Sequence, residues 1–156
     1  SNTRVLSRFS QSGALLNSYS ISGPVRELSK KSQEETFLWI DRPEGTAMGI
    51  VNNINGAITY PYTRPDEPLG SAVEIANGIF AISTSTGLYR YAYSNGGTAV
   101  LNASLVNLTA LYYDDLNGFI YGSKGNMLYQ ISTTGVLVNT FSFSDDVVYF
   151  GVDYNR

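Results

Sequence analysis

The stretch LTALYYDDLNGFIYG, residues 108–122, decides the fold of this chain. Two apolar segments rich in aromatic residues, 110–113 and 119–122, flank the polar run 114–118. Aromatic and β-branched residues favour pleated strands. The pair Asn117-Gly118 is a strong short-range signal for a β-hairpin, because both central residues of a type I′ turn need a positive φ. The stretch therefore predicts two antiparallel strands joined by a tight turn.

The same pattern recurs about every 40 residues. Asn77-Gly78 precedes the apolar segment 79–82 in the same way, and the segment 37–41 has the same phase. Periods of 20–50 residues are typical of repeat architectures. Each repeat reads as four short strands, which gives the units 24–63, 68–105 and 107–143. Three series of glycines share this period: Gly13, Gly56, Gly97 and Gly135; Gly45, Gly87 and Gly125; Gly78 and Gly118.

Four-stranded repeats of about 40–45 residues are the sequence signature of β-propeller blades. One such sheet cannot bury both of its faces, so neighbouring sheets must stack. We therefore predict an all-β, β-propeller-type domain or part of one. It has about four blades of four short antiparallel strands, and a β-sandwich is the alternative. Good helix formers fill residues 26–35, where the repeat expects a strand, so both a strand and a short helix stay open there.

The stretch 108–122, followed by MLYQI at 127–131 and by Thr134-Gly135, resembles a blade of the NHL/YVTN-like propeller repeats. Such repeats are common in bacterial extracellular proteins. The resemblance implies a scaffold rather than a reaction, and an extracellular or cell-surface location. Two N-glycosylation triplets, which begin at Asn102 and Asn107, fit secretion but add little weight.

The two ends of the chain carry an incomplete unit, made of residues 1–22 and 144–156. Residues 5–9 and 14–19 match the third and fourth strands of a blade, and residues 147–153 match a first strand. No second strand is present, and an unpaired strand edge invites another chain. Three arrangements stay open: the chain is a fragment of a larger propeller, a strand from another molecule fills the gap, or the last unit has three strands.

Composition excludes several kinds of chemistry. The chain has no Cys and no His, so it holds no disulfide, thiolate nucleophile, Ser-His-Asp triad or Cys/His zinc site. The net charge is −3 and no basic cluster exceeds Lys30-Lys31, which argues against binding to nucleic acid. No apolar run approaches the ~20 residues that a membrane-spanning helix needs.

Loops that join second to third strands, and fourth strands to the next unit, are expected to emerge on one face. Loops of this kind commonly carry binding sites. The loop 63–68 is the most distinctive, because two prolines stiffen it. A solvated connector made of turn-forming residues accounts for the same charged residues and is the simpler interpretation. The predicted binding residues of this loop face are Asp41, Arg42, Glu44, Arg64, Asp66, Glu67, Lys124, Asp145 and Asp146.

Glu74 and Asp114 are weak candidates for a metal site. They lie at matching repeat positions, four residues before Gly78 and Gly118. Gluconolactonase-like and phytase-like propellers hold metals with carboxylates, so a metal-dependent hydrolase is the enzymatic alternative. Asp and Asn are equally typical of tight turns, and the several converging ligands of a metal site are missing. We therefore expect that the protein has no catalytic residue, needs no cofactor and is not an enzyme.

Tyrosines suggest a second alternative, a carbohydrate-binding module. Tyr89, Tyr91 and Tyr93 alternate along one strand, so they share a face, which is typical of packing between blades. The leading prediction is a non-catalytic, extracellular or surface-associated module. It binds a protein partner or copies of itself through its open strand edge. The tyrosines considered for stacking on a glycan are Tyr89, Tyr91, Tyr93, Tyr112, Tyr113, Tyr121 and Tyr129.

Overall fold

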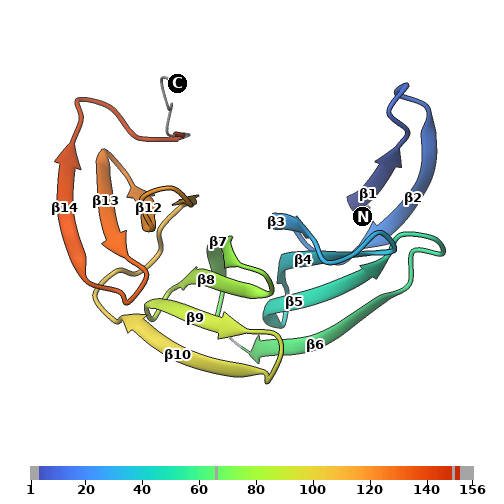
Figure 1. Ribbon diagram of the computed structural model, residues 1–156, viewed down its shortest axis with the longest axis horizontal. Helices are drawn as coiled ribbons and strands as arrows, with labels where there is room; N and C mark the ends of the chain where they lie inside the picture. Colours follow the sequence, from blue (N-terminus) through green and yellow to red (C-terminus); the bar gives the residue numbers. More distant parts are fainter. Residues whose placement is uncertain (1–3, 66, 149, 152–156) are drawn as a thin grey trace. The chain divides into compact units, whose positions relative to one another are not determined.

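The computed structural model describes residues 4–65, 67–148 and 150–151. In these residues it contains fourteen β-strands and no helix (Figure 1). The strands form one two-stranded and three four-stranded sheets, and every strand pair is antiparallel. The prediction of an all-β chain with about four blades, of which the terminal one is incomplete, is confirmed. No helix in the described residues is long and apolar enough to cross a membrane.

Within each sheet, strands that follow one another in the sequence lie side by side. The chain divides into two compact units, Ser1–Pro68 and Leu69–Arg156, which are described separately. The strands of the first unit are β1 (Arg4–Phe9), β2 (Leu15–Ile21), β3 (Val25–Lys30), β4 (Glu35–Arg42), β5 (Gly45–Asn52) and β6 (Ile58–Pro65). Those of the second unit are β7 (Leu69–Ala76), β8 (Ile79–Thr84), β9 (Leu88–Ala92), β10 (Gly97–Asn102), β11 (Ala110–Asp114), β12 (Phe119–Lys124), β13 (Met127–Ser132) and β14 (Leu137–Ser142).

In the first unit, the hairpin β1–β2 packs on one face of the sheet β3–β6. The buried residues Leu38, Ile40, Ala47 and Val51 form the core on this face. The hairpin and the sheet's rim add partly buried side chains to it. Because burial of apolar surface is the main favourable term in folding, this contact holds the two-stranded sheet in place. The added side chains are Leu6, Tyr19, Ile21, Val25, Ile58 and Tyr60.

The first half of the segment 26–35 belongs to strand β3, and no part of the segment is helical. β3 pairs with β4, and Leu28 lies opposite the fully buried Leu38. Residues 31–34 then form the turn into β4. Tertiary pairing of this kind overrides intrinsic helix propensity, which is a weak prior. The strand interpretation of this segment is therefore confirmed.

In the second unit, the sheets β7–β10 and β11–β14 enclose a common core of buried apolar residues. Two hydrogen bonds join the sheets near the start of β11. The N–H of Leu111 in β11 donates to Oγ of Ser71 in β7 at 3.1 Å, and the N–H of Leu108, just before β11, donates to Oγ of the buried Ser83 in β8 at 2.9 Å. At the outer strands, Asn102 Nδ2 donates to the Gly135 carbonyl oxygen at 2.9 Å. The core residues are Ile75, Ala81, Leu88, Leu105, Leu108, Ile120 and Ile131.

The predicted hairpins form, but the prediction of type I′ turns is wrong. Gly78 and Gly118 have positive φ values of 67° and 70°. Among the described residues, Asn107 is the only one that has a positive φ without being a glycine. Asn117 therefore has a negative φ. A side-chain carboxylate closes the second turn instead, because Asp114 Oδ1 accepts from the N–H groups of Leu116 and Asn117.

Two of the strands predicted for the incomplete unit form, both at the N-terminal end. Strands β1 and β2 form where the third and fourth strands of a blade were expected. The predicted first strand does not form in the described residues Val147, Val148, Phe150 and Gly151. The remaining positions of that prediction, residues 149, 152 and 153, lie outside the described residues.

Candidate functional site

The edge of β1 that faces away from β2 is the most distinctive feature of the first unit. Among the described residues, β1 has a hydrogen-bonded neighbour on one side only, which is β2. The backbone N–H and C=O groups on the other side of such a strand can pair with an added strand. By contrast, both inner strands of the neighbouring sheet, β4 and β5, pair on both sides.

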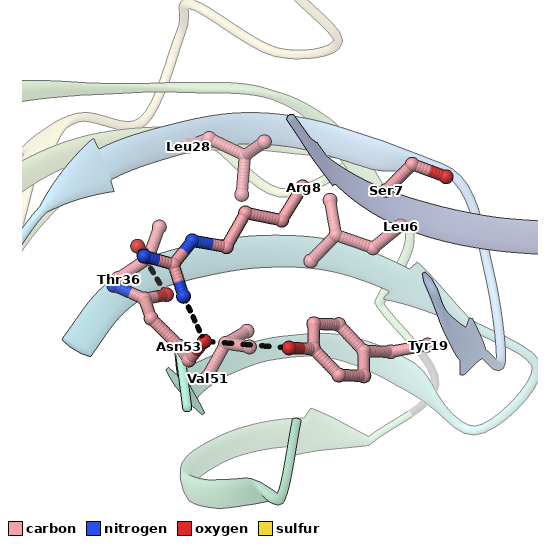
Figure 2. Close-up of a pocket in the computed structure, with 8 residues that line it drawn as sticks. All are labelled: Leu6, Ser7, Arg8, Tyr19, Leu28, Thr36, Val51 and Asn53. Atoms are coloured by element: carbon pink, nitrogen blue, oxygen red, sulfur yellow. Dashed lines mark hydrogen bonds between the residues drawn. The ribbon is translucent and has the colours of Figure 1, made fainter. Parts of the chain in front are cut away.

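A groove of about 200 Å³ lies beside this edge, between the hairpin and the sheet β3–β6 (Figure 2). Strand alternation places Leu6 and Arg8 on the face of β1 that is turned toward the sheet. Figure 2 shows the side chains of Arg8, Leu6, Tyr19 and Leu28 gathered around the same space. The lining comprises Leu6, Ser7, Arg8, Tyr19, Leu28, Thr36, Val51 and Asn53.

Asn53 fixes the polar end of the groove. Its carbonyl oxygen accepts hydrogen bonds from Arg8 Nη1 at 2.5 Å and from the Tyr19 hydroxyl at 3.4 Å. Its side-chain Oδ1 accepts from Thr36 Oγ1 at 3.0 Å, and its N–H donates to the Glu34 carbonyl at 2.7 Å. One residue thus connects β1, β2, β4 and the turn before β4, so this end of the groove is held in shape before any partner binds.

Leu28 forms the apolar wall. It lies on β3 in register with Leu38, so both side chains are on the face that packs against the hairpin. Leu38 is fully buried, whereas Leu28 remains 46% exposed. The hairpin therefore covers the middle of the sheet and leaves part of the face of its edge strand β3 open.

The groove has a positive character. Arg8 is the only charged residue in its lining, and Arg4 and Lys30 are exposed on the strands that border it. Residues 1–31 contain five basic residues and a single acidic one, Glu27, and two of the basic residues, Arg26 and Lys31, form ion pairs with Asp41 and Glu35. A partner that combines apolar and acidic side chains fits this surface better than a basic one.

The predicted loop-face residues of the first unit come together, and most pair with one another. Arg42 and Glu44 form an ion pair of 2.9 Å, and Arg64 forms one with Glu67. Asp41 lies 3.8 Å from Arg26. Arg42, Asp41 and Glu67 line a shallow depression of about 250 Å³. Most of these charged side chains thus form ion pairs with nearby residues, as expected of a structured connector.

The rest of the predicted loop face lies elsewhere. Asp66 is outside the described residues. Lys124, Asp145 and Asp146 belong to the second unit, where all three are exposed. The role of these residues in binding stays a prediction.

The two weak metal candidates act as caps of their hairpins. Glu74 Oε1 accepts from the Gly78 N–H at 2.8 Å. Asp114, which is 1% exposed, accepts from two backbone N–H groups and, at 2.9 Å, from Asn117 Nδ2. In the part of the chain that the structure describes, no group of three or more Asp or Glu side chains is placed to hold a metal ion.

The tyrosines divide between the core and one open face. Tyr89 and Tyr91 are buried, and Tyr113 and Tyr129 pack on the core of the second unit. Tyr93 is half-buried. On the opposite face of β11–β14, Tyr112 and Tyr121 are half-buried, and the Tyr121 hydroxyl accepts from Gln130 Nε2 at 3.0 Å. Most of these rings therefore serve packing.

The sequence did not single out Arg8, Leu28 or Asn53. The segment RELSKK, residues 26–31, held a signal for an exposed apolar residue, because Leu28 is the one apolar side chain among charged and polar ones. Its meaning depends on which strands cover β3, and only the structure shows that.

Comparison with known proteins identifies the type of fold. No protein-family model and no curated protein matches the sequence. Solved structures do match. One, from a nidogen/laminin complex, is 11% identical, covers 83% of this chain and 52% of its own, and has a TM-score of 0.61. The CNH domain of AfRom2 is also 11% identical, covers 92% of this chain and 50% of its own, and has a TM-score of 0.61.

A third match is the extracellular domain of a putative one-component system from B. thetaiotaomicron. It is 20% identical, covers 91% of this chain and 21% of its own, and has a TM-score of 0.58. This chain therefore spans about half the length of the first two structures and about a fifth of the third. At these identities the likeness shows the fold alone, and that fold is the β-propeller type.

Proposed function

We propose that this chain is a protein-binding module that takes up an extended segment of a partner at the free edge of β1. One observation carries the proposal: the unpaired edge of β1 borders a groove in which the apolar side chain of Leu28 is exposed. Addition of a strand to a sheet edge is a common mode of peptide recognition. In this mode main-chain hydrogen bonds give affinity, and pockets for alternate side chains give specificity.

The groove supplies both contributions. The edge of β1 offers backbone donors and acceptors to the incoming segment. Every second side chain of that segment then points toward Leu6 and Leu28, where it buries apolar surface. An acidic side chain near the end of the segment lies beside Arg8, whose guanidinium is already held by the Asn53 carbonyl. The preferred ligand is thus extended, alternately apolar and partly acidic.

The comparisons support a binding role and an extracellular location. The matched structures include a protein complex and a domain described as extracellular. The relation to NHL/YVTN-like repeats stays part of the proposal and rests on the motif at residues 108–122. That the protein is not an enzyme likewise stays a prediction.

Panning a random-peptide phage library on the immobilised protein tests this function. We expect selected peptides to bind the wild type, to lose binding to Leu28→Asp, and to lose it on N-methylation of alternate backbone nitrogens. Ile54→Asp is the control, because Ile54 is an exposed apolar residue of the same unit that lies outside the groove lining. If no peptide is enriched, or if enriched peptides bind Leu28→Asp as well as they bind Ile54→Asp, the proposed function is wrong.

A further inference from the structure

We infer that the segment that occupies the groove is 145–151 of a second copy of this chain, so that two copies exchange these segments. The inference rests on the proposed function and names its partner. Three observations carry it: the charge of the segment, its exposure, and the number of grooves and segments in each copy.

The segment has the chemistry that the groove selects. It begins with the exposed acids Asp145 and Asp146 and continues with Val147, Val148 and, after one further position, Phe150. In an extended conformation, residues 146, 148 and 150 point to one side. That side presents one carboxylate and two apolar groups. The groove presents Arg8 next to the apolar wall of Leu28 and Leu6.

The segment is also available. Its described residues belong to no strand, although β-branched and aromatic residues favour strands. The Val147 N–H donates to the Gly125 carbonyl at 2.8 Å, which anchors the start of the segment to the β12–β13 turn. Beyond this anchor, Val148 is 83% exposed. A cavity of about 470 Å³ lies along the segment between Leu128 and Phe150, and the contact of Phe150 with its own unit is an edge-on approach to the Tyr112 ring, with the ring centroids 6.5 Å apart.

The described part of each copy offers one such groove and one such segment, so the groove of each copy can bind the segment of the other. A reciprocal exchange of this kind closes at the dimer and leaves neither site open. The repeat pattern agrees, since it assigns residues 147–153 to the same blade as β1 and β2.

The test measures mass in solution by light scattering over a dilution series of the full chain. We expect a dimer that dissociates on dilution. Arg8→Glu, which alters the groove, and Val148→Asp, which alters the segment, should each raise the dimer dissociation constant about tenfold or more, because each places a charge in an apolar or like-charged contact. Asp115→Lys is the control for charge, since Asp115 is an exposed acid in the β11–β12 turn.

A mixture of the two variants distinguishes exchange between copies from a contact made within one chain. An Arg8→Glu chain keeps an intact segment and a Val148→Asp chain keeps an intact groove, so a mixed dimer has one native contact. We expect the mixture to associate more tightly than either variant alone. Leu28→Asp replaces Arg8→Glu if the latter fails to fold, as judged by circular dichroism.

The outcomes separate the two proposals. A wild type that stays monomeric at every concentration, or a mixture no tighter than its components, overturns the exchange between copies. In either case, peptides from the phage library that still bind at Leu28 leave the proposed function standing. A monomer whose melting temperature falls in Val148→Asp also overturns the exchange, because the segment then acts within its own chain.

Discussion

Arg8 donates a hydrogen bond of 2.5 Å from Nη1 to the backbone carbonyl oxygen of Asn53, 45 residues further along the chain. This contact links the two-stranded hairpin to the end of β5. A two-stranded hairpin alone is marginally stable in water, so its order depends on such contacts and on the apolar core beneath it.

The first prediction concerns this link. Arg8→Met keeps the aliphatic stem but removes the donor, so we expect the hairpin to lose about 0.5–1.5 kcal/mol of stability, the usual net value of one hydrogen bond. Hydrogen exchange should show faster exchange in β1 and β2 and unchanged exchange in β4 and β5. Equal acceleration in all four strands would contradict a local role.

The second prediction concerns Gly56, whose φ is 74°. A Cβ at this position would meet the ring of Tyr19, whereas a Cβ at Gly13, with a φ of 83°, would meet open space. Both Gly→Ala variants carry the cost of a left-handed residue, about 1–2 kcal/mol. Gly56→Ala should be less stable than Gly13→Ala by about a further 1–3 kcal/mol, since overpacking displaces the ring. Urea denaturation measures the difference, and equal midpoints would show that the Tyr19 ring moves freely.

The third prediction concerns the contact between the sheets of the second unit. Ser83→Ala removes the acceptor of the Leu108 N–H in a fully buried place. A buried donor left without its acceptor costs about 1–3 kcal/mol, so we expect a loss of that size in chemical denaturation. Ser104→Ala is the control, because Ser104 is exposed in the loop before β11. A Ser83→Ala variant as stable as this control would show that the Leu108 N–H has another acceptor.

The fourth prediction separates a turn cap from a metal ligand at Asp114. Asn retains an oxygen that accepts from the N–H groups of Leu116 and Asn117 but loses the acceptor of Asn117 Nδ2, so Asp114→Asn should be destabilised less than Asp114→Ala. Asp114→Ala should lose about 1–2 kcal/mol, comparable with the loss of a helix N-cap. Millimolar calcium should leave the melting temperature of the wild type unchanged, because a ligand that binds only the native state must raise it. A clear rise would establish a cation site.

The repeat period made most of the fold predictable. Glycines and Asn-Gly pairs about 40 residues apart mark turns, and turns fix the ends of strands whatever their partners are. The period also placed strand β3 correctly within residues 26–35, against the local helix propensity. Turn geometry was less predictable, because the Asp114 carboxylate replaces the backbone conformation that Asn117-Gly118 suggests.

The candidate site was only half predictable. The repeat pattern predicted an open strand edge, and among the described residues β1 pairs on one side only. The groove residues Arg8, Leu28 and Asn53 come from β1, from β3 and from just after β5, and no local pattern connects them. Long-range packing brings them together, so the sequence pointed instead to charged loop residues such as Arg64 and Glu67, which turn out to pair with each other.

The bond between Asn102 and Gly135 bears on the first N-glycosylation triplet. Nδ2 of Asn102, which donates to Gly135, is the atom to which an N-linked sugar would be attached. The Oδ1 of the same side chain accepts from the Ser104 N–H, so both ends of the amide are engaged. A sugar at this position would force the outer strands of two neighbouring sheets apart. Asn102 is therefore a poor acceptor for oligosaccharide once the second unit has folded.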